Sequence, residues 1–196
     1  MEIKKGIAVS PGVVIANAVV LDSGEYRIPY RNVPAEQVEA ELEKLRKAFE
    51  DSITELNSLR DATAEQLGRD IASIFDFHYG VLTQGRLREQ IAQLIRNQNY
   101  SAAFAVREAL RGYQRRFLKM QDQLLRERYK DVRDIERRLL RNLIGQEHED
   151  LSNLPEPSIL VAHDLTPSQS ANLVKAKIIG VAMDAGGLTS HTAIVV

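Results

Sequence analysis

The spacing of hydrophobic residues separates a long helical middle from two strand-like ends. From Pro34 onward, apolar side chains recur every three or four residues, the pattern of one buried face of an amphipathic helix. In the first such stretch these positions are Val38, Leu42, Leu45, Phe49, Ile53, Leu56 and Leu59. The spacing therefore predicts a long helix that begins just after Pro34.

The same periodicity predicts further helices along the middle of the chain. A second helix is predicted over 67–81, a short third over 87–94, a long fourth over 106–124 and a final one over 131–144. Gly145 is the C′ residue expected to end the final helix. Amphipathic helices joined by short breaks are typical of a helical bundle or paired hairpins.

The two ends of the chain predict strands instead. The β-branched runs 3–10 and 13–21 predict two strands that are separated by a turn. Beyond a proline-containing linker, 158–162 and 178–183 predict two more. Between them Thr166-Pro167-Ser168-Gln169 has the pattern of a capping box, so a helix is predicted to start at Thr166.

Together these patterns predict an α/β plus all-α fold in two domains. A discontinuous α/β domain is expected from 1–31 and 150–196, and an inserted helical domain from 32–149.

Composition excludes a few functional classes. The 196 residues carry a net charge of −1, which gives no bulk reason to expect nucleic acid or a membrane as partner. The absence of cysteine excludes disulfides and thiolate metal sites. No apolar run approaches the roughly 20 residues of a membrane span, and the first five residues lack the apolar stretch of a secretory signal. We expect a soluble, cytoplasmic protein.

Candidate chemistry gathers near the end of the chain, in Gly186-Gly187-Leu188-Thr189-Ser190-His191. Paired glycines let the backbone approach a ligand closely. Thr189 and Ser190 supply hydroxyl groups and candidate helix caps. The start of a helix presents free N–H groups and partial positive charge, which suit a phosphoryl group. His191 beside such a site is placed as a nucleophile. A glycine-rich turn with a surface histidine is the alternative interpretation.

This string resembles the phosphohistidine signature of enzyme I of the sugar phosphotransferase system (phosphoenolpyruvate–protein phosphotransferase). Three more stretches, 5–12, 131–140 and 160–168, resemble the same family in the same order. Shorter versions of the string occur in the swivelling domains of pyruvate phosphate dikinase and phosphoenolpyruvate synthase. Those enzymes carry an ATP-grasp region ahead of that domain, which this chain does not resemble.

The resemblance implies a swivelling phosphohistidine α/β domain with an inserted HPr-binding helical domain. It implies a phosphotransferase enzyme in which His191 accepts a phosphoryl group from phosphoenolpyruvate and passes it to a histidine of HPr. Gly187, Thr189 and Ser190 would stabilise that group. Thr166 matches a threonine near the active histidine of relatives, although helix capping alone would explain it.

The resemblance also implies an HPr-docking face on the helical domain. The expected contact residues are His78, Val81, Leu87, Leu124, Leu125 and Arg128. His78 lies in an apolar stripe, which is more typical of a packed histidine than of a catalytic one.

The charges of this face depart from many relatives. Residues 81–87 lack an acidic cluster, and the next predicted helix is basic, with Arg107, Arg111, Arg115 and Arg116. Either the cognate HPr is less basic on its matching surface, or docking depends on apolar side chains.

In the family the chain continues beyond the position of Val196. We therefore expect an α/β domain that is incomplete at its C-terminus and no metal or cofactor in this fragment. A C-terminal domain would bind phosphoenolpyruvate with Mg²⁺ and form the homodimer. Two alternatives stay open: a swivelling domain of a dikinase or synthase, and a non-catalytic helical interaction module.

Overall fold

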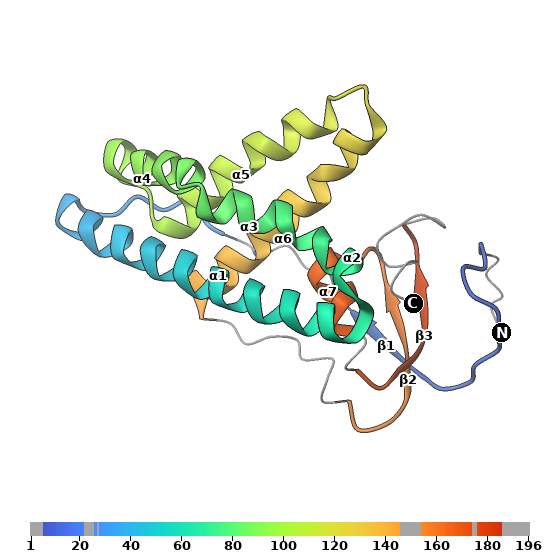
Figure 1. Ribbon diagram of the computed structural model, residues 1–196. Helices are drawn as coiled ribbons and strands as arrows, with labels where there is room; N and C mark the ends of the chain where they lie inside the picture. Colours follow the sequence, from blue (N-terminus) through green and yellow to red (C-terminus); the bar gives the residue numbers. More distant parts are fainter. Residues whose placement is uncertain (1–5, 22–25, 27, 146–153, 174–175, 186–196) are drawn as a thin grey trace. The chain divides into compact units, whose positions relative to one another are not determined.

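The chain folds into two compact units. The computed structural model describes residues 6–21, 26, 28–145, 154–173 and 176–185 (Figure 1). One unit, here called the α/β unit, comprises Met1–Gly24 and Glu149–Val196. The other, here called the helical unit, comprises Glu25–His148.

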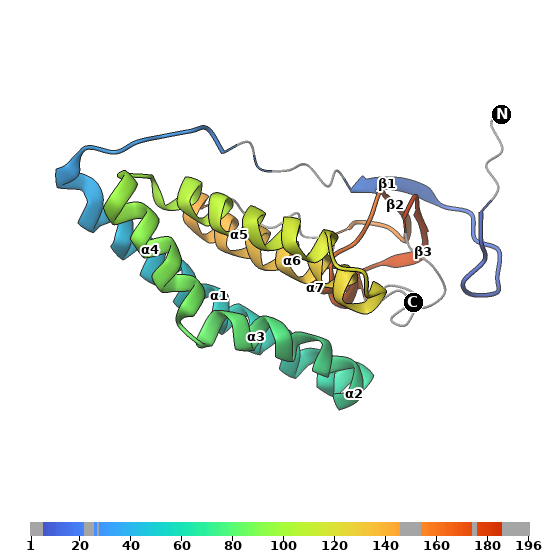
Figure 2. The same cartoon turned by 90° about the horizontal axis from the view of Figure 1, so that it is seen from above.

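The helical unit is built from six α-helices and two short 3-10 turns among its described residues. They are η1 (Ala35–Gln37), α1 (Val38–Leu67), α2 (Arg69–Ala72), η2 (Ser73–Phe75), α3 (Asp76–Thr83), α4 (Arg86–Gln98), α5 (Ala102–Leu118) and α6 (Gln123–Ile144). Figure 2 shows α5 and α6 side by side as a hairpin, and α1 also packs against α3, α4 and α6.

Large apolar side chains from several helices close the core of this unit. Phe49 of α1, Phe75 of η2, Leu110 of α5 and Leu139 of α6 are all buried. Burying such a side chain is worth about 1.5–3 kcal/mol. The amphipathic pattern of the sequence therefore corresponds to an assembled core.

Two side chains accept hydrogen bonds from the first N–H groups of α5, one distant in sequence and one directly before the helix. The Ala102 N–H donates to Glu41 Oε2 of α1 at 2.8 Å, and the Phe104 N–H donates to Ser101 Oγ at 3.4 Å. Because the first N–H groups of a helix have no partner within it, these bonds fix where α5 begins.

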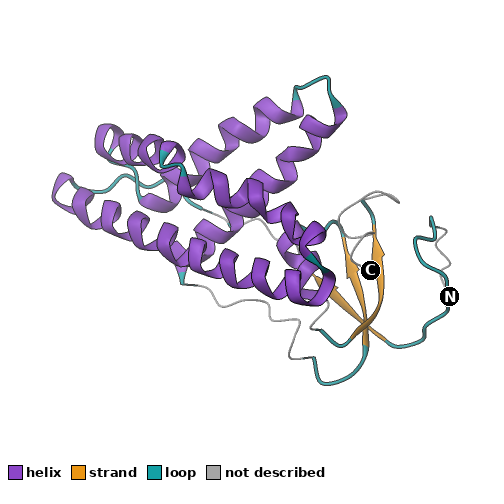
Figure 3. Cartoon of the chain, viewed as in Figure 1, coloured by secondary structure: helices purple, strands orange, loops and turns teal. Residues whose placement is uncertain are grey.

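The α/β unit contains a parallel sheet of strands β1 (Asn17–Leu21), β2 (Ser158–Ala162) and β3 (Ile178–Met183), in that order (Figure 3). The only helix among its described residues is α7 (Pro167–Asn172). Five side chains form its buried cluster: Leu21, Leu160, Ala162, Leu165 and Leu173.

Two strand predictions are wrong in part. Residues 6–10 form no strand, residues 1–5 lie outside the described residues, and of 13–21 only Asn17–Leu21 is a strand. Val13 and Ile15 are 93% and 95% exposed. A β-branched run makes a strand only where a neighbouring strand and a buried face are available.

The predicted helix boundaries also need correction. The predicted break between the first two helices falls later, at Gly68 (φ +95°), so that α1 continues to Leu67. The predicted fourth helix, 106–124, ends at Leu118, and α6 begins at Gln123, before the predicted start at 131. Apolar spacing happens to continue across the turn between α5 and α6, which hides the break. The predicted stop at Gly145, with φ +71°, is confirmed.

Candidate functional site

Polar groups gather where β2 and β3 end. His163 Nδ1 lies 3.3 Å from Asp184 Oδ2, and the Ala185 N–H donates to the His163 carbonyl at 2.9 Å. Carboxyl ends of parallel strands are where open α/β sheets bind ligands. Gly186 and Gly187 follow Ala185 directly in the sequence. The candidate phosphohistidine string therefore comes directly after this edge of the sheet.

Thr166 begins α7 as predicted. Its Oγ1 accepts from the Gln169 N–H at 3.3 Å, and Gln169 Oε1 accepts from the Thr166 N–H at 3.0 Å, so the capping box is confirmed. Capping occupies a hydroxyl lone pair and does not use the O–H proton. A contact between Thr166 and a phosphoryl group remains a prediction.

The other predicted residues of this site are Gly187, Thr189, Ser190 and His191, and they lie outside the described residues. Their roles rest on the sequence string and stay predictions.

In the helical unit, His78 of α3 sits between two carboxylates of α6. Its Nε2 is 3.2 Å from Asp131 Oδ1, and its Nδ1 is 3.5 Å from Asp134 Oδ2. An ionised carboxylate only accepts hydrogen bonds, so the Nε2–H of His78 donates to Asp131. The ring thereby links α3 to α6.

Two predicted docking residues are buried. His78 is 1% exposed and Leu87 is 4% exposed, so both side chains belong to the helical core, and their contact with a partner stays a prediction. The interpretation of His78 as a packed histidine is confirmed.

Arg128 connects this buried group to the surface. Its Nη1 donates to Asp131 Oδ2 at 3.0 Å, and its guanidinium carbon lies 5.0 Å from the centre of the Phe77 ring. The side chain is 44% exposed. Asp131 thus holds the buried His78 on one oxygen and the exposed Arg128 on the other. A guanidinium over an aromatic ring gains a cation–π attraction and keeps its orientation.

Sequence reasoning missed the part that Asp131 and Phe77 play here. A signal was present, since Asp131 and Asp134 are three residues apart in a helix whose neighbouring Val132 and Ile135 face inward. Two acidic residues beside an apolar stripe indicate a buried cationic partner, which lies on another helix.

Among the other predicted contacts, Val81 is half-buried and Leu125 is 48% exposed. Leu124 belongs to α6, and its side chain lies outside the described residues.

Within the described part of the chain, no group of three or more His, Cys, Asp or Glu residues is placed to hold a metal ion. Nor does any described helix combine the length and the apolar character needed to cross a membrane.

Two family models match this chain. Residues 5–128 match the family model described as "PEP-utilising enzyme, N-terminal", and residues 154–196 match that of the "PEP-utilising enzyme, mobile domain". The chain therefore matches the N-terminal part and the mobile domain of the PEP-utilising enzyme family.

Similar proteins identify the family within this class more closely. The chain is 35% identical over 189 residues to the phosphoenolpyruvate-protein phosphotransferase of Haemophilus influenzae and 38% identical over 190 residues to that of Staphylococcus aureus. These matches include 96% and 97% of this chain, but only 33% of the length of either relative.

Solved structures give the same result. The chain matches a solution structure of enzyme I (nEIt) with a TM-score of 0.79 and 33% identity, over 97% of this chain and 77% of that one. It also matches an N-terminal domain of enzyme 1–nitrogen with a TM-score of 0.69 and 26% identity, over 95% and 76%. The chain belongs to the enzyme I family and corresponds to its N-terminal region, which confirms the predicted fold class.

Proposed function

We propose that this chain is the phosphoryl-carrying region of a phosphotransferase enzyme I, with His191 as the carrier. The observation that supports this best is the Gly-Gly-Leu-Thr-Ser-His string, which follows the end of β3 in the sequence. A solved structure of enzyme I matches 97% of this chain.

The chemistry consists of two phosphoryl transfers. In the first, a neutral ring nitrogen of His191 attacks phosphorus, the bond from phosphorus to the enol oxygen of phosphoenolpyruvate breaks, and the enolate takes a proton to give pyruvate. In the second, a histidine nitrogen of HPr attacks the same phosphorus, and the P–N bond to His191 breaks. Histidine suits both steps because its neutral form is available near pH 7.

The residues around His191 position the transferred group. Hydroxyls of Thr189 and Ser190, and N–H groups after Gly187, would donate to the phosphoryl oxygens and balance their charge. Thr166, fixed at the start of α7 by its capping box, would add a third hydroxyl.

The first transfer needs parts of a longer protein. In the proposed whole enzyme, a C-terminal domain binds phosphoenolpyruvate with Mg²⁺ and forms the homodimer, in the cytoplasm.

The helical unit provides the docking surface for HPr. Val81, Leu125 and Arg128 are accessible there, and the buried His78–Asp131 pair holds α3 and α6 in register beneath Arg128.

Incubation with phospho-HPr tests the proposal, with the phosphorylated residue located by mass spectrometry. We expect phosphate on His191 that is lost in acid and kept in base, as a phosphoramidate requires. His191→Ala should remove it, and Thr189→Ala should slow the transfer because one donor is lost. Phosphoenolpyruvate with Mg²⁺ alone should leave this chain unlabelled. Phosphate on any other residue would refute the assignment.

A further inference from the structure

The free end of the α5–α6 hairpin exposes apolar side chains. Leu118, at the end of α5, is 51% exposed, Met120 in the turn is 37% exposed and Leu125, at the start of α6, is 48% exposed. Figure 1 shows this connection in yellow, at the far end of the hairpin from the start of α5. The other large hydrophobic side chains exposed in the described part of the helical unit are Tyr30, Tyr79 and Ile144. Half of them therefore gather at this one end.

Cationic side chains lie close in sequence to these apolar residues. Arg115, Arg116, Lys119 and Arg126 are exposed within one helical turn of Leu118 or Leu125. Arg116 also lies over the Tyr113 ring, with its guanidinium carbon 5.8 Å from the ring centre. We call Leu118, Met120, Leu125 and these four cations the hairpin surface.

The charge of this segment is opposite to that of the whole chain. Residues 115–128 contain five Arg or Lys and two Asp or Glu, whereas the chain carries −1 overall. One of the two acids, Asp122, accepts the Leu125 N–H at 3.2 Å and so acts as a cap of α6. The end of the hairpin is thus locally positive and also exposes apolar side chains.

We propose that the hairpin surface docks a small phosphocarrier protein whose matching face has an apolar centre and a carboxylate rim. This rests on the proposed function, which requires a phosphocarrier partner. An apolar centre inside a polar rim is the usual anatomy of a protein interface. Three of the four cations are Arg, whose planar guanidinium pairs with carboxylates through two hydrogen bonds. A partner with a basic face would be repelled at the same place.

A membrane or a nucleic acid fits this surface less well. Binding to a bilayer surface requires the whole apolar face of an amphipathic helix, but the apolar faces of α5 and α6 are already buried through residues such as Val106, Leu110 and Leu139. Nucleic acids gain affinity from a long row of phosphate contacts, whereas these cations end with the hairpin.

Two probes test the partner's chemistry: an HPr with a basic docking face, and its variant with the Lys and Arg residues of that face changed to Glu. Calorimetric titration of the whole chain should show about tenfold tighter binding of the acidic-faced probe at about 50 mM salt, and a smaller preference at about 300 mM because salt screens exposed charges.

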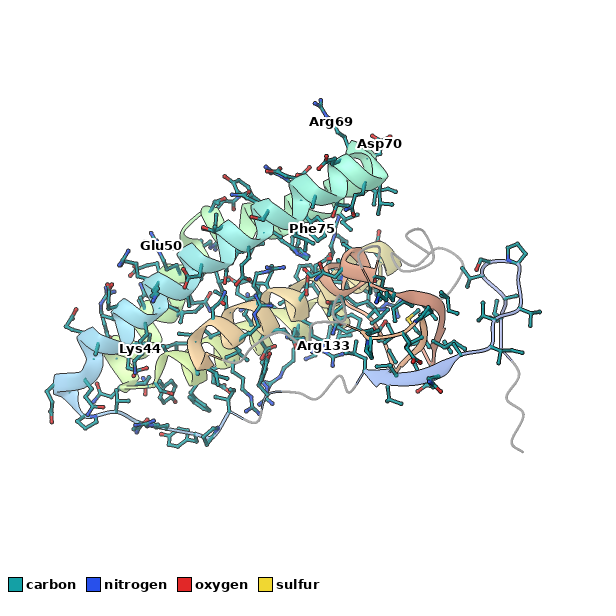
Figure 4. All side chains as sticks on the ribbon, turned by 90° about the horizontal axis from the view of Figure 1, so that it is seen from below. Lys44, Glu50, Arg69, Asp70, Phe75 and Arg133 are labelled. Atoms are coloured by element: carbon teal, nitrogen blue, oxygen red, sulfur yellow. The ribbon has the colours of Figure 1, made fainter. Side chains whose placement is uncertain are left out.

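Variants of this chain test whether the preference for the acidic-faced probe comes from the hairpin surface. Arg115→Glu/Arg116→Glu should reverse the preference, and Arg115→Ala/Arg116→Ala should reduce it. Lys47→Glu/Arg69→Glu changes the charge equally at exposed positions of α1 and α2 and should leave the preference unchanged. Figure 4 shows Arg69 pointing away from the helices.

Tighter binding of the basic-faced probe, or equal effects of both Glu pairs, would overturn the inference. So would binding of anionic vesicles or duplex DNA through Arg115 and Arg116 while neither probe binds. Phosphoryl transfer from both phosphorylated probes to His191 without a charge preference would overturn this inference alone. A clear preference without any phosphoryl transfer would instead count against the proposed function.

Discussion

The helical unit and the α/β unit bury their apolar side chains to different extents. In the helical unit, large residues such as Phe49, Phe75 and Leu139 are fully enclosed. In the α/β unit, Val20 of β1 is 71% exposed and Ile179 of β3 is 48% exposed. Parallel sheets are normally covered on both faces. The helical unit therefore completes its own core, whereas the described sheet has one packed face.

Polar side chains differ between the units in the same way. In the helical unit they join helices that are distant in sequence, as in Asn142 of α6, which donates to Ser52 of α1 at 3.0 Å. In the α/β unit, His163 and Asp184 at the strand ends are 66% and 82% exposed. The Asn142–Ser52 pair serves structure, whereas His163 and Asp184 remain accessible for binding.

Truncating a core aromatic residue should have the largest effect. Phe75→Ala leaves a cavity at a fully buried position and should lower the free energy of unfolding of the helical unit by about 3–5 kcal/mol. Far-UV circular dichroism during denaturant titration measures it. A loss below about 1 kcal/mol would contradict this prediction and show that neighbouring side chains fill the cavity.

Removing one buried charge should have the next largest effect. Asp131→Asn keeps the shape but weakens the links to His78 and Arg128, so the helical unit should lose about 1.5–3 kcal/mol. The exposed Asp51→Asn in α1 is the matched control and should change stability by less than about 0.5 kcal/mol. Equal effects of the two changes would contradict a buried ion pair.

Glu41 should contribute a smaller, pH-dependent stabilisation. Burial alone would raise its pKa, but hydrogen bonds from Lys44 and the Ala102 N–H outweigh burial and hold the pKa below the ordinary value of 4.5. A lowered carboxylate pKa stabilises the folded state above the unfolded pKa, and this stabilisation is lost as the pH falls through the folded pKa.

Glu41→Gln should therefore cost about 1 kcal/mol at pH 7 and make the loss of stability on acidification less steep. Denaturant titrations at a series of pH values measure both effects. Glu65→Gln, at an exposed position of the same helix, should change neither. An unchanged acid slope in Glu41→Gln would contradict the proposed contribution.

The smallest effect is expected on the open side of the sheet. Val20→Thr should change stability by no more than about 0.5 kcal/mol, because the side chain is already largely exposed. Thermal unfolding of the two proteins measures the difference. A loss of several degrees would show that Val20 packs against a covering segment.

Local patterns were sufficient to predict much of this molecule. The capping box at Thr166, the stop at Gly145 and the strands at 158–162 and 178–183 depend on neighbouring residues, and all were predicted. The unpaired segment before Asn17 was not, because a β-branched run does not reveal whether a neighbouring strand exists.

Pairings between distant residues could not be predicted from periodicity. His78 and Asp131 are 53 positions apart, and only the packing of α3 on α6 brings them together. The same packing explains why His78, expected on the docking face, is buried. The string at 186–191 was found because its chemistry is contiguous in sequence.

The central claim is that docking belongs to the helical unit and chemistry to the α/β unit. Calorimetric binding of HPr to the chain and to His191→Ala, with phosphoryl transfer measured on the same samples, tests it most directly. The two dissociation constants should agree within about twofold, as for sites without shared partners, and the variant should carry no acid-labile phosphate. Loss of HPr binding in His191→Ala together with loss of phosphate would contradict it.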